Sequence, residues 1–183
     1  PVTAMHVYED LKGKIPLILD GGKCTGGIES TVLDVTTDTP IILRSGLVTA
    51  EMIKSVVGKC AYSQNKPTDK IRAPGMKYRH YCPKCETALF KRDDYKEAQA
   101  LYDEYVAQGK TPYFMCDGAM ENKIRGKVLK LGNTAQEIAS NLYDKLHEGE
   151  SVADILIAFE VETGSDVDVG IMNRLSKACK KYE

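Results

Sequence analysis

The spacing of apolar residues along the chain changes at about residue 83. Before that point, short apolar runs are separated by glycine-rich and polar stretches. Beyond it, apolar runs alternate with longer segments whose apolar residues recur every three or four positions. The first pattern predicts helices at 3–11 and between Thr49 and Gly58, and strands at 16–20, 31–35 and 40–43. The second predicts strands at 87–90, 112–116, 127–131 and 155–159, and helices at 93–107, from Thr134 and around 171–179.

Three parts follow from this pattern. Residues 83–183 alternate strands with helices, which predicts a small Rossmann-like domain with a mostly parallel sheet. Residues 1–58 would be marginal as an isolated domain, because a chain that short buries only about 60% of its surface. Residues 59–82 show no sustained apolar period and contain two prolines, so we interpret them as a linker arm. The predicted fold class is therefore α/β, with an α+β part first and the Rossmann-like domain second.

The composition limits the function. Apolar residues make up 43% and charged residues 28% of the chain, with a net charge of −1, as in ordinary soluble globular proteins. No apolar run is long enough to span a membrane or to direct secretion, and the six cysteines are expected to be reduced thiols. The near-neutral charge argues against a dedicated polyanion binder, although residues 59–82 hold six basic residues and one acidic residue.

Two motifs lie next to the predicted strands of the first part. Residues 20–32 contain four glycines and continue through Glu29 into Ser30 and Thr31. Glycines allow a close backbone approach to a ligand, and the hydroxyls can donate to a carboxylate or phosphate, but a flexible hairpin loop is the simpler interpretation. Arg44 ends an apolar strand, where a guanidinium suits phosphate or a base, although a surface salt bridge is its commoner role.

The linker arm contains the most unusual run, residues 73–81. Its Pro-Gly turn is followed by two tyrosines, two cations and a histidine within five residues. This composition suits closure over a nucleotide or an acidic ligand. Packing of Tyr78 and Tyr81 against a neighbouring domain would account for it as well.

The other candidate groups carry less weight. Cys82 and Cys85 form a single C-x-x-C pair without a second pair, so we expect neither a metal site nor a redox function. His6 and His147 lie on predicted helices and are expected to be structural.

Together these residues resemble a known family. The start of the chain, residues 20–32 and residues 42–46 are similar to the C-terminal half of a YrdC-type domain. Residues 73–84 resemble the linker of the long, two-domain branch of the threonylcarbamoyl-AMP synthases, in the Sua/YrdC/YwlC family. The last part, including residues 170–175, resembles the extra C-terminal domain of that branch. The resemblance covers essentially the whole chain.

The resemblance implies an activity. Such enzymes combine L-threonine, bicarbonate and ATP into threonylcarbamoyl-AMP and pyrophosphate in the cytoplasm. ATP is used as a substrate, expected with Mg²⁺, and no tightly bound cofactor is implied. Transfer proteins then carry the group to tRNA, which makes tRNA an indirect partner. By position, the implied threonine-binding residues are Ser30, Thr31 and His80, and the implied ATP-binding residues are Arg44, Tyr78 and Tyr81.

The family's Lys-x-Arg and Ser-x-Asn motifs, which bind ATP and threonine, lie upstream of the region that this chain resembles. We therefore expect a C-terminal fragment of a synthase that is inactive alone. Two other functions stay open. One is an RNA-binding module, since YrdC-type domains resemble a basic concave RNA-binding surface, although only residues 59–82 of this chain are basic. The other is a regulatory or lid domain formed by residues 83–183.

Overall fold

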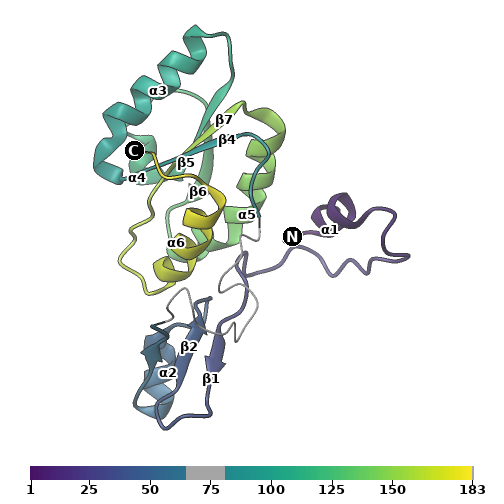
Figure 1. The fold of residues 1–183 in the computed structure, drawn as a ribbon, viewed down its shortest axis with the longest axis vertical. Coiled ribbons are helices and arrows are strands. Elements are labelled where there is room, and N and C mark those ends of the chain that lie inside the picture. The colour runs from purple at the N-terminus through teal and green to yellow at the C-terminus, as the bar shows by residue number, and fades with distance from the viewer. Residues whose placement is uncertain (65–80, 183) are drawn as a thin grey trace.

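The computed structural model describes residues 1–64 and 81–182, which form two separate β-sheets (Figure 1). Residues 1–64, here called the N-terminal segment, contain a three-stranded sheet. Residues 81–182, here called the C-terminal lobe, contain a four-stranded sheet. None of the helices in these two ranges has the length and apolar content needed to cross a membrane.

The sheet of the N-terminal segment has the strand order β1-β2-β3. Strands β1 (Val32–Asp34) and β2 (Ile41–Arg44) are antiparallel and joined by the polar turn at 36–39. Strand β3 (Ala61–Tyr62) pairs in parallel with β2. The sequence pattern predicts no strand at β3, which falls inside the range 59–82 interpreted as a linker arm.

Two helices of the N-terminal segment begin at the predicted caps. Helix α1 (Ala4–Leu11) starts after Thr3, and helix α2 (Ala50–Val57) starts after Thr49. Both threonine side chains accept a hydrogen bond from a backbone N–H of the first turn. Helix α2 ends at Gly58, which takes the left-handed conformation with φ 79°. These predicted boundaries are confirmed to within a residue.

The predicted strand at 16–20 is wrong. These residues join no sheet in the part of the chain that the structure describes, and Leu17 and Leu19 are 71% and 86% exposed. An apolar run needs a partner strand to satisfy its backbone, and none of the described strands pairs with it. Helix α1 likewise turns Met5 and Tyr8 to the surface, and none of its eight residues is buried. Helix α1 therefore adds no buried residue to a core of the described chain.

The C-terminal lobe is built on a four-stranded parallel sheet in the order β4-β7-β5-β6, which confirms the predicted α/β class. Its strands are β4 (Glu86–Phe90), β5 (Pro112–Asp117), β6 (Val128–Gly132) and β7 (Ile155–Phe159). Its helices are the 3₁₀ turn η1 (Arg92–Asp94), α3 (Tyr95–Ala107), α4 (Gly118–Glu121), α5 (Ala135–Val152) and α6 (Val167–Ala178). Short α4 is the one helix among these that the sequence pattern does not predict.

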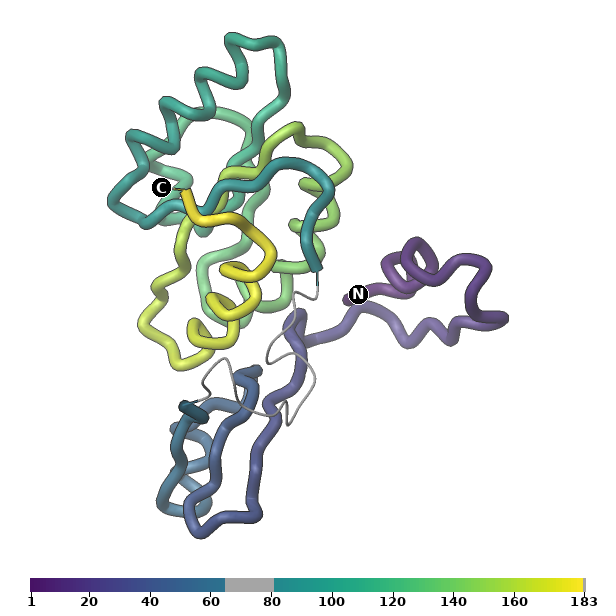
Figure 2. Tube along the Cα trace, in the orientation of Figure 1, coloured from purple at the N-terminus to yellow at the C-terminus, as the bar shows by residue number. Residues whose placement is uncertain are grey.

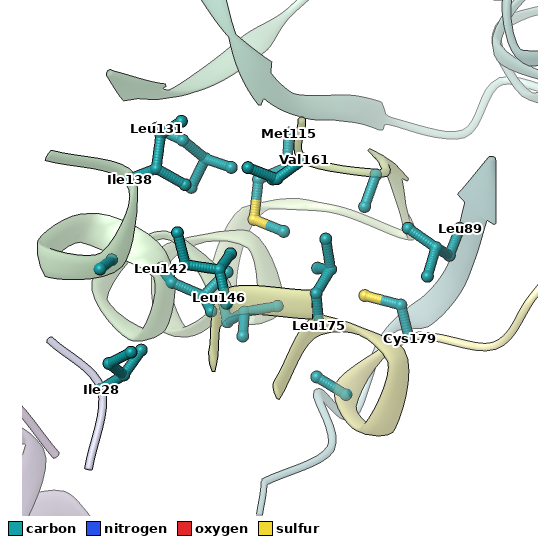
Figure 3. Packing of buried hydrophobic residues seen from close by; sticks show 14 of the residues in the cluster. Ile28, Leu89, Met115, Leu131, Ile138, Leu142, Leu146, Val161, Leu175 and Cys179 are labelled. Carbon is teal, nitrogen blue, oxygen red and sulfur yellow. The ribbon is translucent and has the colours of Figure 1, made fainter. Parts of the chain in front are cut away.

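Both faces of the parallel sheet are buried, as alternate residues of β7 demonstrate. Ile155, Ile157 and Phe159 belong to a cluster with residues of α3 on one face. Leu156 and Ala158 belong to a second cluster on the other face. Figure 3 shows side chains of this cluster from α5 and α6, among them Leu142 and Leu175. This alternation is the two-residue period of a strand covered on both sides.

The N-terminal segment is anchored to the α5–α6 face of the lobe. Figure 2 follows the chain from α1 back to the lobe and then into β1. At this crossing, Ile28 joins the buried cluster that contains Leu142 and Leu175 (Figure 3). A Cβ on neighbouring Gly27 would lie 2.2 Å from the Ala139 carbonyl oxygen, so only glycine allows this approach to α5. The crossing fixes where the residues just before β1 lie.

Candidate functional site

The β1–β2 hairpin brings two predicted site residues together. Val32 pairs with Arg44 across the antiparallel ladder, so Arg44 lies beside the residues that precede β1. Its Nε donates to the Ser30 carbonyl oxygen at 3.1 Å, and its Nη2 lies 3.5 Å from Ser30 Oγ. The Thr31 hydroxyl donates to the Val48 carbonyl oxygen at 2.6 Å. An exposed serine hydroxyl beside a half-exposed guanidinium can receive a carboxylate or a phosphate.

A hollow of about 370 Å³ adjoins Ser30 of this pair, and Arg44 is not among the described residues that line it. Two of its lining residues, Ser30 and Thr31, carry hydroxyls. Its other lining residues are the apolar Ile28, Leu33, Leu47, Val48 and Ile53. A few polar groups in a mainly apolar hollow are typical of sites for small molecules.

Glycine at position 46 allows the end of β2 to lie against the residues before β1. A Cβ there would be 2.5 Å from both the Glu29 carbonyl oxygen and the Thr31 nitrogen. At Gly46 and Gly27 the space that a side chain would need is filled by protein backbone. At these two positions the glycines therefore serve packing of chain against chain.

Glu29, the neighbour of Ser30, is held by two residues of the C-terminal lobe. Arg174 Nε donates to Glu29 Oε2 at 2.7 Å, and Arg174 Nη1 donates to the Ser45 carbonyl oxygen at 2.7 Å. The Tyr143 hydroxyl donates to Glu29 Oε1 at 3.4 Å. Burial alone would raise the pKa of Glu29, but the hydrogen bond from Arg174 and its positive charge hold that pKa below its usual value. Burial and the charge of Glu29 raise the pKa of Tyr143 to about 12.

Sequence reasoning assigns no role to Arg174 or Tyr143. A signal for Arg174 exists, because it lies on the apolar stripe of α6 between Ile171 and Leu175, where a cation needs a partner. The spacing of residues does not identify that partner, because Glu29 lies 145 positions away.

Replacing Glu29 with glutamine is expected to weaken the dependence of stability on acid pH. Because folding lowers the pKa of Glu29, its carboxylate stabilises the fold above its unfolded pKa, and this contribution is lost as the pH falls through the folded value. Urea unfolding of the 183-residue chain at about pH 5 and about pH 3 measures this change in the free energy of unfolding. Wild type should lose more stability over this interval than Glu29→Gln, and equal losses in the two proteins would contradict the ion pair.

Tyr81 occupies a different place from Ser30 and Arg44, while Tyr78 and His80 lie outside the described residues. The Tyr81 hydroxyl donates to Glu150 of α5, and its ring centroid is 4.4 Å from that of His147. Burial, followed by the hydrogen bond to Glu150, raises the pKa of Tyr81, which keeps the phenol protonated.

A cavity of about 390 Å³ connects Tyr81 with the loop before β1. Its lining includes Tyr81, Tyr143 and His147 on one side and Gly27 and Glu29 on the other. Tyr81 is therefore brought to the same cavity as the neighbour of Ser30. The serine and Arg44 themselves are not among the described residues that line it.

The remaining candidate residues make local structural contacts. Cys82 Sγ lies 3.7 Å from the Ala178 carbonyl oxygen, and Cys85 packs against the α5–α6 cluster. Within residues 1–64 and 81–182, no group of three or more cysteine, histidine or acidic side chains is placed to hold a metal ion. His6 and His147 stack with ring centroids 4.4 Å apart, which joins α1 to α5.

Comparisons with known proteins agree with this architecture. A family model described as threonylcarbamoyl-AMP synthase, C-terminal domain, matches residues 48–179, and the Sua5/YciO/YrdC model, described as telomere recombination, matches residues 1–46. Proteins named threonylcarbamoyl-AMP synthase from Pyrococcus abyssi and Schizosaccharomyces pombe are 37% and 36% identical over 97% of this chain. The matches cover 53% and 48% of those relatives, so the chain spans about half their length.

A solved structure shares the fold. The crystal structure of P. abyssi Sua5 complexed with L-threonine matches with a TM-score of 0.83 and 35% identity. The match covers 100% of this chain and 56% of that one. A double variant of the same P. abyssi protein matches with a TM-score of 0.82 and 34% identity, covering 97% of this chain and 52% of that one.

Proposed function

Because the chain belongs to the threonylcarbamoyl-AMP synthase family, we propose that it serves in the synthesis of threonylcarbamoyl-AMP from L-threonine, bicarbonate and ATP. The observation that carries the proposal is the Ser30 hydroxyl, which lies beside the Arg44 guanidinium and lines a hollow with room for an amino acid. The match to a Sua5 protein complexed with L-threonine supports it.

The reaction needs a fixed cation. The threonine amino group attacks the carbon of bicarbonate, and loss of water leaves a carbamate. A carbamate oxygen then attacks the α-phosphorus of ATP, the bond from that phosphorus to the bridging oxygen breaks, and pyrophosphate leaves. Negative charge on the phosphoryl oxygens in this step is stabilised by a positioned cation.

The residues of the hairpin suit both substrates. We assign the Ser30 hydroxyl to the threonine carboxylate, and Arg44 to the phosphates of ATP, which would arrive with Mg²⁺. The Thr31 hydroxyl donates a hydrogen bond to the Val48 carbonyl oxygen, so the hydroxyl oxygen is left to accept one from the neutral amino group of threonine that attacks bicarbonate. The apolar lining of the adjoining hollow suits the threonine methyl group.

The arm residues are assigned to the open side of the site. We propose that Tyr78 and Tyr81 contact the nucleotide and that His80 contacts threonine. The Tyr81 hydroxyl is engaged by Glu150, so the proposed contact of Tyr81 is through its ring. An arm that covers the site would exclude water from the labile carbamate–phosphate anhydride.

We further propose that the activity belongs to a longer polypeptide. Here "whole protein" means a polypeptide that carries residues 1–183 together with the Lys-x-Arg and Ser-x-Asn motifs of the family. Residues 1–183 alone supply only one side of the substrate site and are proposed to be inactive. The product is proposed to reach tRNA in the cytoplasm through transfer proteins.

The release of pyrophosphate tests the proposal. The whole protein should release pyrophosphate from ATP only when threonine and bicarbonate are both present, and the 183-residue chain should release none. Omitting each substrate in turn is the control. Pyrophosphate release that does not require threonine or bicarbonate would overturn the proposal. Tight, salt-dependent RNA binding without any release would favour the RNA-binding alternative.

A further inference from the structure

Helix α6 of the C-terminal lobe lies against the residues that flank Ser30 and Arg44 in the chain. A Cβ on Gly170, in the first turn of α6, would lie 3.6 Å from both the nitrogen and the Cα of Gly46. One turn later, Arg174 reaches into the N-terminal segment with two hydrogen bonds of 2.7 Å. The lobe therefore contacts the hairpin at the end that carries the proposed substrate residues.

Arg174 binds two acceptors that are each one peptide bond from a proposed substrate residue. Glu29 directly precedes Ser30, and Ser45 directly follows Arg44. Because a guanidinium is planar and rigid, one arginine that holds both acceptors also fixes the distance between the two backbone segments. The hydrogen bond from Arg44 Nε to the Ser30 carbonyl oxygen joins the same two segments directly.

Stability alone is a poor explanation for this arginine. Arg174 is 5% exposed, and its Nη2 has no hydrogen-bond partner among the residues that the structure describes. The desolvation of a buried guanidinium and carboxylate often costs more free energy than their attraction provides. Replacing such a pair with apolar side chains of the same volume therefore often leaves the protein equally stable or more stable. What the structure shows of this pair is its geometry, since Arg174 joins Glu29 to the Ser45 carbonyl oxygen.

We propose that Arg174 is a positioning residue of the synthase reaction, through which the C-terminal lobe holds Ser30 and Arg44 at the spacing that threonine and ATP require. The chemistry of this inference rests on the proposed function. In this inference the C-terminal lobe supports the geometry of the substrate site through Arg174, which is a different role from that of a lid.

The test compares buried Arg174 with a second arginine in the whole protein. Arg92 is the matched control, because this partly buried arginine also binds a carboxylate, that of Asp117, and a carbonyl oxygen, that of Glu160, but both lie inside the lobe. Arg174→Met should lower kcat/KM on the order of 100-fold, including a rise in KM for threonine and ATP, since a small misplacement can cost that much. Loss of folded protein lowers kcat and leaves KM unchanged, so Arg92→Met should keep both KM values.

A double variant separates misfolding from misplacement. Glu29→Met with Arg174→Met removes both charges, so no unpaired ion is buried, and this protein should fold but keep the raised KM values. Wild-type KM values in a folded Arg174→Met or double variant would overturn the inference.

Hydrogen exchange on the 183-residue chain gives a readout that needs no activity. The amides at 29–31 and 44–46 should exchange faster in Arg174→Met than in Arg92→Met, and equal exchange in the two variants would overturn the positioning role. If wild-type whole protein makes no threonylcarbamoyl-AMP, the proposed function fails, and the exchange comparison still decides whether Arg174 orders the two segments.

Discussion

Replacing Arg44 with alanine in the whole protein is expected to lower kcat/KM for pyrophosphate release by about 100-fold to 1,000-fold, the usual effect of removing one group that stabilises developing charge. Arg44 ends β2 with its guanidinium beside the Ser30 hydroxyl, which makes it the proposed cation for the phosphates of ATP. Initial rates at varied ATP, with threonine and bicarbonate saturating, measure the change.

Arg125→Ala is the control for this prediction. Arg125 is an exposed arginine of the C-terminal lobe whose backbone nitrogen, not its guanidinium, makes the hydrogen bond to Gln99. The Arg125→Ala substitution removes the same charge from the protein without changing the hairpin. The kcat/KM of this variant should stay close to that of wild type. A similar loss in both variants would mean that overall charge, rather than the position of Arg44, sets the rate.

Replacing Leu142 with alanine is expected to lower the free energy of unfolding of the C-terminal lobe by about 3 kcal/mol. Leu142 is fully buried on α5, in the cluster that also holds Ile28 from the N-terminal segment (Figure 3). The loss combines the transfer free energy of the removed isopropyl group with the cost of the cavity left behind. Urea unfolding of the 183-residue chain, followed by circular dichroism, measures the difference.

The matched control is Leu19→Ala, which removes the same atoms from a side chain that is 86% exposed. Its effect on unfolding should stay within about 0.5 kcal/mol, as is usual for surface substitutions. Equal losses at both leucines would contradict the assignment of the core to the α5–α6 face. A loss for Leu142→Ala much below about 2 kcal/mol would mean that neighbouring side chains close the cavity.

The elements of the C-terminal lobe could be predicted from sequence because local signals agree with tertiary packing. Thr134 and Glu137 form the capping box that starts α5, as their three-residue spacing indicates. The apolar run at 155–159 becomes the strand that is buried on both faces. In both places the residue pattern and the final environment favour the same structure.

The N-terminal segment shows why local pattern is insufficient elsewhere. Residues 16–20 have the composition of a strand, but a strand exists only where another strand accepts its hydrogen bonds. Strand β3 has only two residues, too few for an alternating pattern to be visible, and it is defined by its parallel pairing with β2. Both outcomes depend on contacts distant in sequence.

In the candidate site, too, some contacts could be predicted from the sequence and others could not. The adjacency of Ser30 and Arg44 could be expected, because two strands joined by a short polar turn form a hairpin. The contact of Arg174 with Glu29 and Ser45 could not, because it depends on how α6 packs against that hairpin. A cation on an apolar helical stripe indicates a buried partner without identifying it.

Incorporation of labelled bicarbonate tests most directly the claim that these residues form part of a threonylcarbamoyl-AMP synthase. The whole protein is incubated with ¹⁴C-bicarbonate, ATP and threonine, and nucleotides are separated by chromatography with detection of mass and label. The account predicts label in a product with the mass of threonylcarbamoyl-AMP that disappears when threonine or ATP is omitted, and that falls strongly in Arg44→Ala. An active, folded protein that forms no labelled adenylate, or forms it without threonine, would contradict the account.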